Sequence, residues 1–184
     1  MFLQIINHMK KTIQLLSVIV ATTLSANAQS VFQASLTPDI AIETKDTQIN
    51  GVALSIWGQN PQSAFALGFV NGSSGESKGF TLGLVNYSDS YNGVAWGAVN
   101  YSTGEFNGWQ WGLFNISTGK FTGFENAWVN VANEFNGLQY GLVNYAAKLN
   151  GVQIGIVNVA LNNPWFSEFP DKLATGFPFV NWSF

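Results

Sequence analysis

Hydrophobic and polar residues alternate along most of this 184-residue chain, in segments of eight or nine residues that return every 14 or 15 positions. The segment that starts at Gly108 reads GWQWGLFNIS, and the one that starts at Gly137 reads GLQYGLVNYA. Alternation over this length, in residues rich in Val, Phe, Trp and Tyr, predicts β-strands. Eight repeats lie within about residues 51–160, one alternating segment precedes them, and a terminal strand is expected over 176–184. We therefore expect a single repeat-built all-β domain over 29–184, with about ten strands.

Clusters of small and polar residues separate the segments and predict turns. Ser102-Thr103-Gly104 is one such cluster, and Asn-Gly pairs stand at 92–93, 107–108, 136–137 and 150–151. A glycine in such a pair can adopt the positive φ that a bend requires. Each repeat therefore reads as one strand followed by one turn.

The two faces of each expected strand differ in character. In one representative repeat, Trp109, Trp111 and Leu113 share one face, while Gln110 and Gly112 share the other. Side chains alternate between the faces of a strand, so the repeats predict one large apolar surface and one narrow, partly polar surface. Strict alternation also assigns the Val that precedes the fixed Asn of most repeats to the narrow surface.

The first architecture that fits is a small antiparallel up-and-down β-barrel of eight to ten strands in an outer membrane. A β protein can span lipid only as a closed barrel, and such barrels consist of alternating segments with aromatic belts at both interfaces. The belts would be formed by tyrosines at the strand ends, namely Tyr87, Tyr101 and Tyr145. The narrow face would bring polar side chains to the lumen, namely Gln110, Glu125, Gln139 and Gln153.

The second architecture that fits is a soluble or surface-attached β-solenoid, in which each repeat forms one turn of a coil. Stacked repeats would align the fixed asparagines in a ladder, namely Asn86, Asn100, Asn115, Asn130, Asn144 and Asn158. The regular repeats favour this fold, as do strands shorter than the roughly 9–11 residues of a membrane barrel. The tryptophans favour the barrel, because turns of 14–15 residues would leave Trp96, Trp109 and Trp111 in water. We expect the barrel and keep the solenoid as the alternative.

The first 28 residues have the layout of a secretory signal peptide. Lys10 and Lys11 precede an apolar stretch over 13–24, and the small-residue sequence Ser-Ala-Asn-Ala follows at 25–28. A basic region, a short apolar region and an A-x-A site predict export with cleavage after Ala28.

The composition removes most catalytic and metal chemistry. Charged residues make up 9% of the chain, against about 25% in an average soluble domain. Cysteine and arginine are absent, and His8 lies within the signal. The exported chain then has neither Cys nor His, which excludes disulfides, thiolate nucleophiles and His-dependent catalysis. Five lysines against ten acids give it a net charge of −5, which argues against nucleic-acid binding. We expect no catalytic residue, cofactor or metal.

The C-terminal region contains two aromatic features. Val180, Trp182 and Phe184 alternate along the last strand, which resembles the terminal assembly signal of Gram-negative outer-membrane proteins. The longest connection, over 161–175, is the expected recognition loop, and its aromatic residues are Trp165, Phe166 and Phe169.

Tandem GLQ-x-GLVN units, at 137–144 and 151–158, together with the closing P-x-V-N-W-S-F, resemble the surface-repeat proteins of Gram-negative bacteria. The resemblance covers the chain from about residue 50 to its end. It implies an exported, envelope-associated protein and carries over no catalytic residues.

Together these observations predict an exported protein of the outer membrane or cell surface with a structural or surface-interaction role and no catalysis. A barrel would have membrane lipid and the outer-membrane assembly machinery as partners, with an unknown surface ligand. The alternative is an adhesin-like solenoid that binds through its aromatic face. A small lipid-modifying barrel enzyme ranks last, because it would depend on Ser and on Glu125 without a histidine.

Overall fold

The structure is a computed structural model that describes residues 28–184. The expected signal peptide, apart from Ala28, lies outside the described residues. Within residues 28–184 every regular element is a β-strand: β1 (Gln29–Thr37), β2 (Ile40–Ala41), β3 (Gln48–Asn60), β4 (Ser63–Ser102), β5 (Phe106–Trp111), β6 (Phe114–Asn126), β7 (Val129–Tyr140), β8 (Val143–Ala160) and β9 (Gly176–Ser183).

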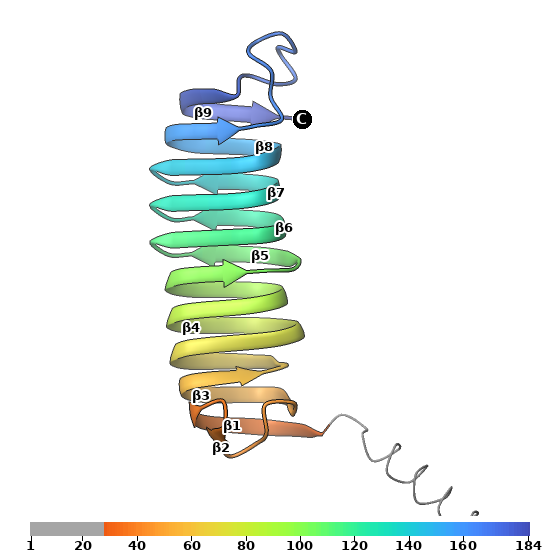
Figure 1. Cartoon of the computed structure of the whole chain (residues 1–184), viewed down its shortest axis with the longest axis vertical. Helices are drawn as coiled ribbons and strands as arrows, with labels where there is room; N and C mark the ends of the chain where they lie inside the picture. Colours follow the sequence, from red (N-terminus) through yellow and green to blue (C-terminus); the bar gives the residue numbers. More distant parts are fainter. Residues whose placement is uncertain (1–27) are drawn as a thin grey trace, which may run out of the picture.

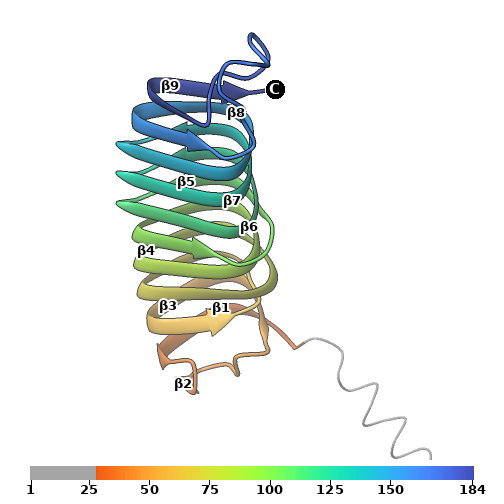
Figure 2. The same ribbon diagram turned by 45° about the horizontal axis from the view of Figure 1, so that its top comes forward.

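The strands wind in one direction around a common axis and form a β-solenoid (Figure 1, Figure 2). From β3 to β8 neighbouring strands pair in parallel, and Gly93, Gly108 and Gly123 are partners on successive turns. One repeat of 14 or 15 residues therefore makes one turn. The all-β class and the solenoid alternative are confirmed. The antiparallel up-and-down barrel is wrong, because each repeat pairs in parallel with the next.

The segments that we expected to be tight turns between strands form an additional side of the solenoid, which stacks from one turn to the next. Ser102 and Ser117 are buried one above the other, with their hydroxyl groups 3.0 Å apart. Farther along the same two turns, Phe106 and Phe121 are buried and their rings stack at 5.1 Å. A turn of 14 or 15 residues can close on itself because this interior is narrow and is filled mainly by small or polar side chains.

Both ends of the solenoid are covered by antiparallel pairing. β2 pairs with β1 at the N-terminal end, and β9 pairs with β8 at the C-terminal end (Figure 1). The connection over 161–175 packs against β9, where the backbone N–H of Leu173 donates to the carbonyl of Trp182 at 3.2 Å. At each end of the solenoid, an antiparallel strand therefore terminates the parallel stacking.

A ladder of buried asparagines runs through the interior. Each Nδ2 donates to the Oδ1 of the asparagine one turn later, at 2.8–3.0 Å, along the series Asn71, Asn86, Asn100, Asn115, Asn130, Asn144 and Asn158. Most of these amides also donate to a backbone carbonyl, as Asn100 does to Trp111 at 3.0 Å. All seven side chains are buried. This ladder, expected as part of the solenoid alternative, is confirmed.

Gly108 shows why a glycine is needed at this corner of the coil. Its φ is 138°, and the equivalent glycines Gly93, Gly123, Gly137 and Gly151 have φ between 132° and 147°. A Cβ at Gly108 would also collide with the carbonyl oxygen of Gly93 on the previous turn. Glycine therefore provides a conformation that L side chains rarely adopt and lets the turns stack closely.

Replacement of one ladder asparagine should destabilise the whole coil. Asn115→Ala leaves the buried Oδ1 of Asn130 without its donor and removes one acceptor from the amide of Asn100. Each unsatisfied buried group costs about 1–3 kcal/mol, so we expect a loss of about 2–4 kcal/mol in the free energy of unfolding. Denaturant titration followed by far-UV circular dichroism measures this loss.

The control is the same substitution at an exposed asparagine. Asn136→Ala removes an exposed side chain and should change stability by less than about 0.5 kcal/mol. Equal effects of the two substitutions would contradict the ladder's role.

Candidate interaction surface

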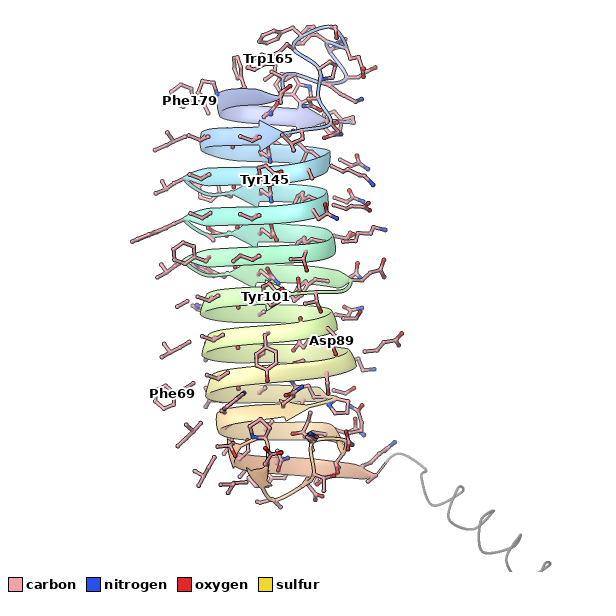
Figure 3. The ribbon with its side chains drawn as sticks, in the orientation of Figure 1. Phe69, Asp89, Tyr101, Tyr145, Trp165 and Phe179 are labelled. Atoms are coloured by element: carbon pink, nitrogen blue, oxygen red, sulfur yellow. The ribbon has the colours of Figure 1, made fainter. Side chains whose placement is uncertain are left out.

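One row of apolar side chains runs along the outside of the solenoid at a corner of the coil. The sixth position of every repeat contributes one member, and this corner stripe consists of Ile56, Phe69, Leu84, Ala98, Leu113, Trp128, Leu142 and Ile156. Trp128 is 61% exposed and Ile156 is 62% exposed. In Figure 3, Phe69 projects from this side of the molecule. Phe179 of β9 projects from the same side, near the C-terminal end of the solenoid. The apolar row therefore extends along the coil from Ile56 to Ile156, with the small Ala98 among its larger members.

Strict alternation fails at this corner. Leu113 and Phe114 are neighbours in sequence, yet they are 38% and 44% exposed. The chain bends at Gly112 and Leu113 before it continues to the buried Asn115, so both residues at the bend point outward. The same applies to Val143 and Val157, which we had assigned to the narrow face. The outer surface is thus more apolar than the alternation predicts.

A cluster of aromatic rings lies beside the corner stripe. Trp96 and Trp111 stack at 4.8 Å with an angle of 3° between their planes, and Trp109 contacts Trp111 and Phe124 at 5.8 and 5.7 Å. These four residues belong to the side that also carries the exposed Tyr140. We call this side the tryptophan flank. The three tryptophans are exposed on the solenoid, as the sequence implied for this fold.

Between the corner stripe and the tryptophan flank lies a groove of about 590 Å³. Its floor includes Gly112, Ala127, Gly141 and Gly155 on successive turns, and Phe179 lies at its C-terminal end. A Cβ at Gly141 would collide with the carbonyl oxygen of Ala127 on the previous turn and approach the Asn130 amide at 2.7 Å, so the glycine lets the turns stack closely along this floor. The lining contains no charged side chain.

On the other side of the corner stripe, the tyrosines form a single row. Tyr101 and Tyr145 lie on the same face of the coil (Figure 3). Because parallel stacking superimposes the ninth position of every repeat, Tyr87 belongs to the same row. The prediction that these tyrosines form belts at two opposite interfaces is therefore wrong. We call this row, with the apolar residues at the same position of the other repeats, the tyrosine flank.

The charged side chains of the coil gather on the remaining edge. Asp89 lies opposite the side from which Phe69 projects (Figure 3). Apart from Glu125, the charged residues between 47 and 163 all belong to this charged edge: Glu76, Lys78, Asp89, Glu105, Lys120, Glu134 and Lys148. Lys148 pairs with Glu134 at 2.5 Å, and hydrogen bonding to Lys148 holds the pKa of Glu134 below its ordinary value.

The four expected lumen residues lie inside the coil. Gln110, Glu125, Gln139 and Gln153 are at most 1% exposed and occupy equivalent positions on successive turns. The Gln153 amide donates to Gln139 at 2.8 Å, and the Gln139 amide donates to Glu125 at 2.8 Å. They form a second buried ladder in a closed interior, so they do not line a water-filled lumen.

Burial dominates the chemistry of Glu125. Its carboxyl accepts hydrogen bonds from Gln139 and from the Ser117 hydroxyl at 3.2 Å, but neither partner is charged. Burial raises the pKa of this carboxyl from 4.5 to about 8. The Gln110 Oε1, one turn below, is buried without a donor. When Glu125 is protonated, its carboxyl has an O–H group, which is the kind of donor that the Gln110 oxygen is without.

The expected assembly signal and recognition loop come together in the C-terminal cap. The indole of Trp182 donates to the Pro170 carbonyl at 2.8 Å, and its ring lies 6.3 Å from that of Phe169. Phe184 is 72% exposed, and the aromatic residues of the connection, Trp165, Phe166 and Phe169, are also exposed. β9, with Val180, therefore caps a solenoid end and does not close a barrel.

The part of the chain that the structure describes has neither a membrane-spanning helix nor a metal-binding cluster. No helix in residues 28–184 is long and apolar enough to cross a membrane. Over the same residues, no group of three or more Asp, Glu, His or Cys side chains is placed to hold a metal ion.

The buried carboxyl of Glu125 makes stability depend on pH. Its pKa in the folded chain lies above the ordinary value, so between about pH 4.5 and pH 8 folding takes up a proton. The free energy of unfolding should therefore fall as pH rises through this range, by up to about 1.4 kcal/mol per pH unit. Glu125→Gln should remove this slope and be more stable than the parent chain at pH 8, as measured by denaturant titration across the range.

Glu134→Gln provides the matched control for Glu125→Gln. Glu134 is on the charged edge and its pKa is lowered, so its contribution is lost only when pH falls through that lower pKa. This variant should keep the slope between pH 5 and pH 8. Parallel curves for the parent chain and Glu125→Gln would show that Glu125 does not cause the slope.

Comparison with protein families, with curated proteins and with solved structures finds no match for this chain. The similarity to surface-repeat proteins therefore stays a prediction from the sequence. We infer the function from the placement of the residues, namely a closed polar interior, an apolar corner stripe with two aromatic flanks, and a charged edge on the opposite side.

Proposed function

We propose that this chain is an exported β-solenoid of the outer membrane or cell surface that acts by binding, and that the corner stripe with its flanks is the binding surface. One observation carries the proposal. An apolar stripe without a charged residue follows the solenoid from Ile56 to Ile156, while the charges of the coil, except Glu125, lie on another edge. The expected signal at 1–28 supports export.

The extent of the apolar surface favours a partner. Single exposed apolar residues are ordinary, but soluble monomers rarely expose contiguous apolar patches larger than a few hundred Å². Here Phe69, Leu84, Trp128 and Ile156 are each at least 57% exposed, and they belong to one row. Covering such a row removes apolar surface from water and stabilises the complex.

The buried state of Glu125 favours binding over catalysis. The lipid-modifying enzyme depends on this carboxyl, which has no exposed surface and is bonded to Gln139 and Ser117. A catalytic base has to come within hydrogen-bond reach of its substrate. Glu125 serves better as a member of the interior ladder.

The aromatic residues favour an apolar partner over a ligand that stacks on ring faces, such as a sugar. Trp96 and Trp111 stack on each other along the solenoid axis with nearly parallel planes. Each ring therefore covers a face of the other. A ligand that stacks on an aromatic residue needs a free ring face, whereas an apolar surface can pack against the exposed ring edges.

Polar substitutions in the corner stripe should abolish apolar binding. The parent chain should enter the detergent-rich phase when a detergent solution is warmed to separate into two phases. The triple variant Leu113→Thr, Trp128→Thr and Leu142→Thr should lower the detergent-to-water ratio by at least about a hundredfold, or about 2.7 kcal/mol. Full burial of one such side chain contributes about 1.5–3 kcal/mol, and each of the three has only part of its surface left to bury.

A triple substitution at exposed asparagines controls for the number of changes. Asn107→Thr, Asn136→Thr and Asn150→Thr change residues equivalent to Thr122, so threonine is compatible with this corner of the coil. This variant should partition like the parent chain. A parent chain that remains in the aqueous phase would contradict the proposed function.

A further inference from the structure

We propose that the partner is a lipid bilayer and that the solenoid lies flat on it, with its axis parallel to the membrane plane. The corner stripe then reaches into the acyl-chain region, and the charged edge faces water. This inference rests on the proposed function and specifies both its partner and the orientation of binding.

The charged edge determines the orientation. Its residues recur turn after turn, from Glu76 to Lys148, so it runs parallel to the axis, as the corner stripe does. A solenoid standing upright in the bilayer would carry its charged edge through the hydrocarbon, where each charge is costly. Lying flat, the solenoid immerses the stripe while its charged edge remains in water.

The two flanks match the composition of a membrane interface. The tyrosine flank lies between the corner stripe and the charged edge on the face seen in Figure 3, where Tyr101 and Tyr145 are labelled. The tryptophan flank lies on the other side of the stripe, because its residues occupy the second and fourth positions of the repeat and the stripe occupies the sixth. Trp111 and Tyr140 belong to one flank, and Tyr101 and Tyr145 belong to the other. Tryptophan and tyrosine are enriched where lipid meets water, because their rings combine an apolar body with a polar group. When the solenoid lies flat, both rows lie at headgroup level.

The backbone tolerates partial immersion. Hydrogen bonds between turns run parallel to the axis, as in the pairing of Leu138 with Val152 on the next turn. Immersing a side of the coil therefore places bonded backbone groups in the apolar region, where unpaired groups would be strongly unfavourable. The antiparallel strands β2 and β9 lie at the two ends of the coil, and Phe179 of β9 adds an apolar side chain on the side that is immersed.

The spread of apolar side chains over two sides of the coil favours lipid over a second copy of the chain. Apolar side chains continue from the stripe onto both flanks, so a flat partner would cover one flank and leave the other in water. The small Ala98 also interrupts a row of large side chains and makes the stripe uneven. Fluid acyl chains adapt to such a surface and cover both flanks.

The charges on the protein predict which lipid headgroups are sufficient for binding. The charged edge holds four acids and three lysines, a net charge of −1. It therefore lacks the lysine-rich composition that attracts anionic headgroups. Binding should occur on vesicles of neutral phosphatidylcholine and should be insensitive to salt.

The absence of cysteine from the chain allows a direct test of orientation. Single cysteines carrying an environment-sensitive dye are placed along the stripe, by Phe69→Cys, Leu113→Cys and Ile156→Cys. Lys120→Cys, in the same turn as Leu113, labels the charged edge and is the matched control. Each labelled protein is added to phosphatidylcholine vesicles that carry a quencher at a known depth in the acyl region.

The flat orientation predicts equal behaviour along the stripe. All three stripe labels should shift to shorter emission wavelengths and lose emission to the quencher to the same extent, while the label at position 120 should do neither. Quenching that changes steadily from position 69 to position 156 would show an upright solenoid and would overturn the proposal.

Two further outcomes separate this inference from the proposed function. If the parent chain partitions into detergent but does not float with vesicles, the binding role stands and the lipid partner is wrong. If the stripe labels are already shielded in vesicle-free protein and quench one another, the surface is an interface between copies of the chain, which also overturns the inference.

Discussion

A buried asparagine side chain has to satisfy two amide hydrogens and a carbonyl oxygen, and in this solenoid the oxygen is paired by another asparagine one turn away. Asn100 bonds to Asn86 on one side and Asn115 on the other, at 2.9 and 2.8 Å. This pairing keeps successive repeats in register, because a shift by one residue would place an apolar side chain against the buried amides. The repeat length, the glycines at the corners and the parallel pairing all depend on it.

The polar interior changes where apolar residues can go. Asn, Gln, Ser, Ala and a column of aromatic rings from Tyr91 to Phe135 fill the narrow space within the coil. The larger apolar side chains of each repeat therefore lie outside. In most soluble proteins such residues form the core, whereas here they form the corner stripe and its flanks. The apolar surface that we propose for binding thus follows from the same constraint that stacks the turns.

The sequence alone predicted the repeat unit, the all-β class and which face of each strand is narrow. The positive φ of Gly93, Gly108, Gly137 and Gly151 also follows from the Asn-Gly pairs. The choice between barrel and coil did not follow, because eight alternating residues look the same whether the next strand runs parallel or antiparallel. Ser102, which we had placed in a turn, is buried in the coil, and so is Phe106 a few residues later.

The candidate surface was only partly predictable. Leu113, Leu142 and Ile156 were assigned correctly to the apolar face, but alternation could not show that Phe114 also points outward at the corner. The parallel stacking that gathers Tyr101 and Tyr145 on one flank depends on the topology. Glu125 stood out in the sequence as the acid among glutamines, yet its closed environment could be recognised only after the coil was known.

The distance between spin labels at sixth-position residues tests the central claim of stacked parallel turns most directly. Pairs placed one to five repeats apart, from Leu84 to Ile156, should separate by about 4.8 Å for each added repeat, and reach about 24 Å at five repeats. Up-and-down strands would instead place successive sixth-position residues alternately toward opposite ends of the sheet. Distances that alternate between short and long, without a steady increase, would contradict the solenoid and the surface that depends on it.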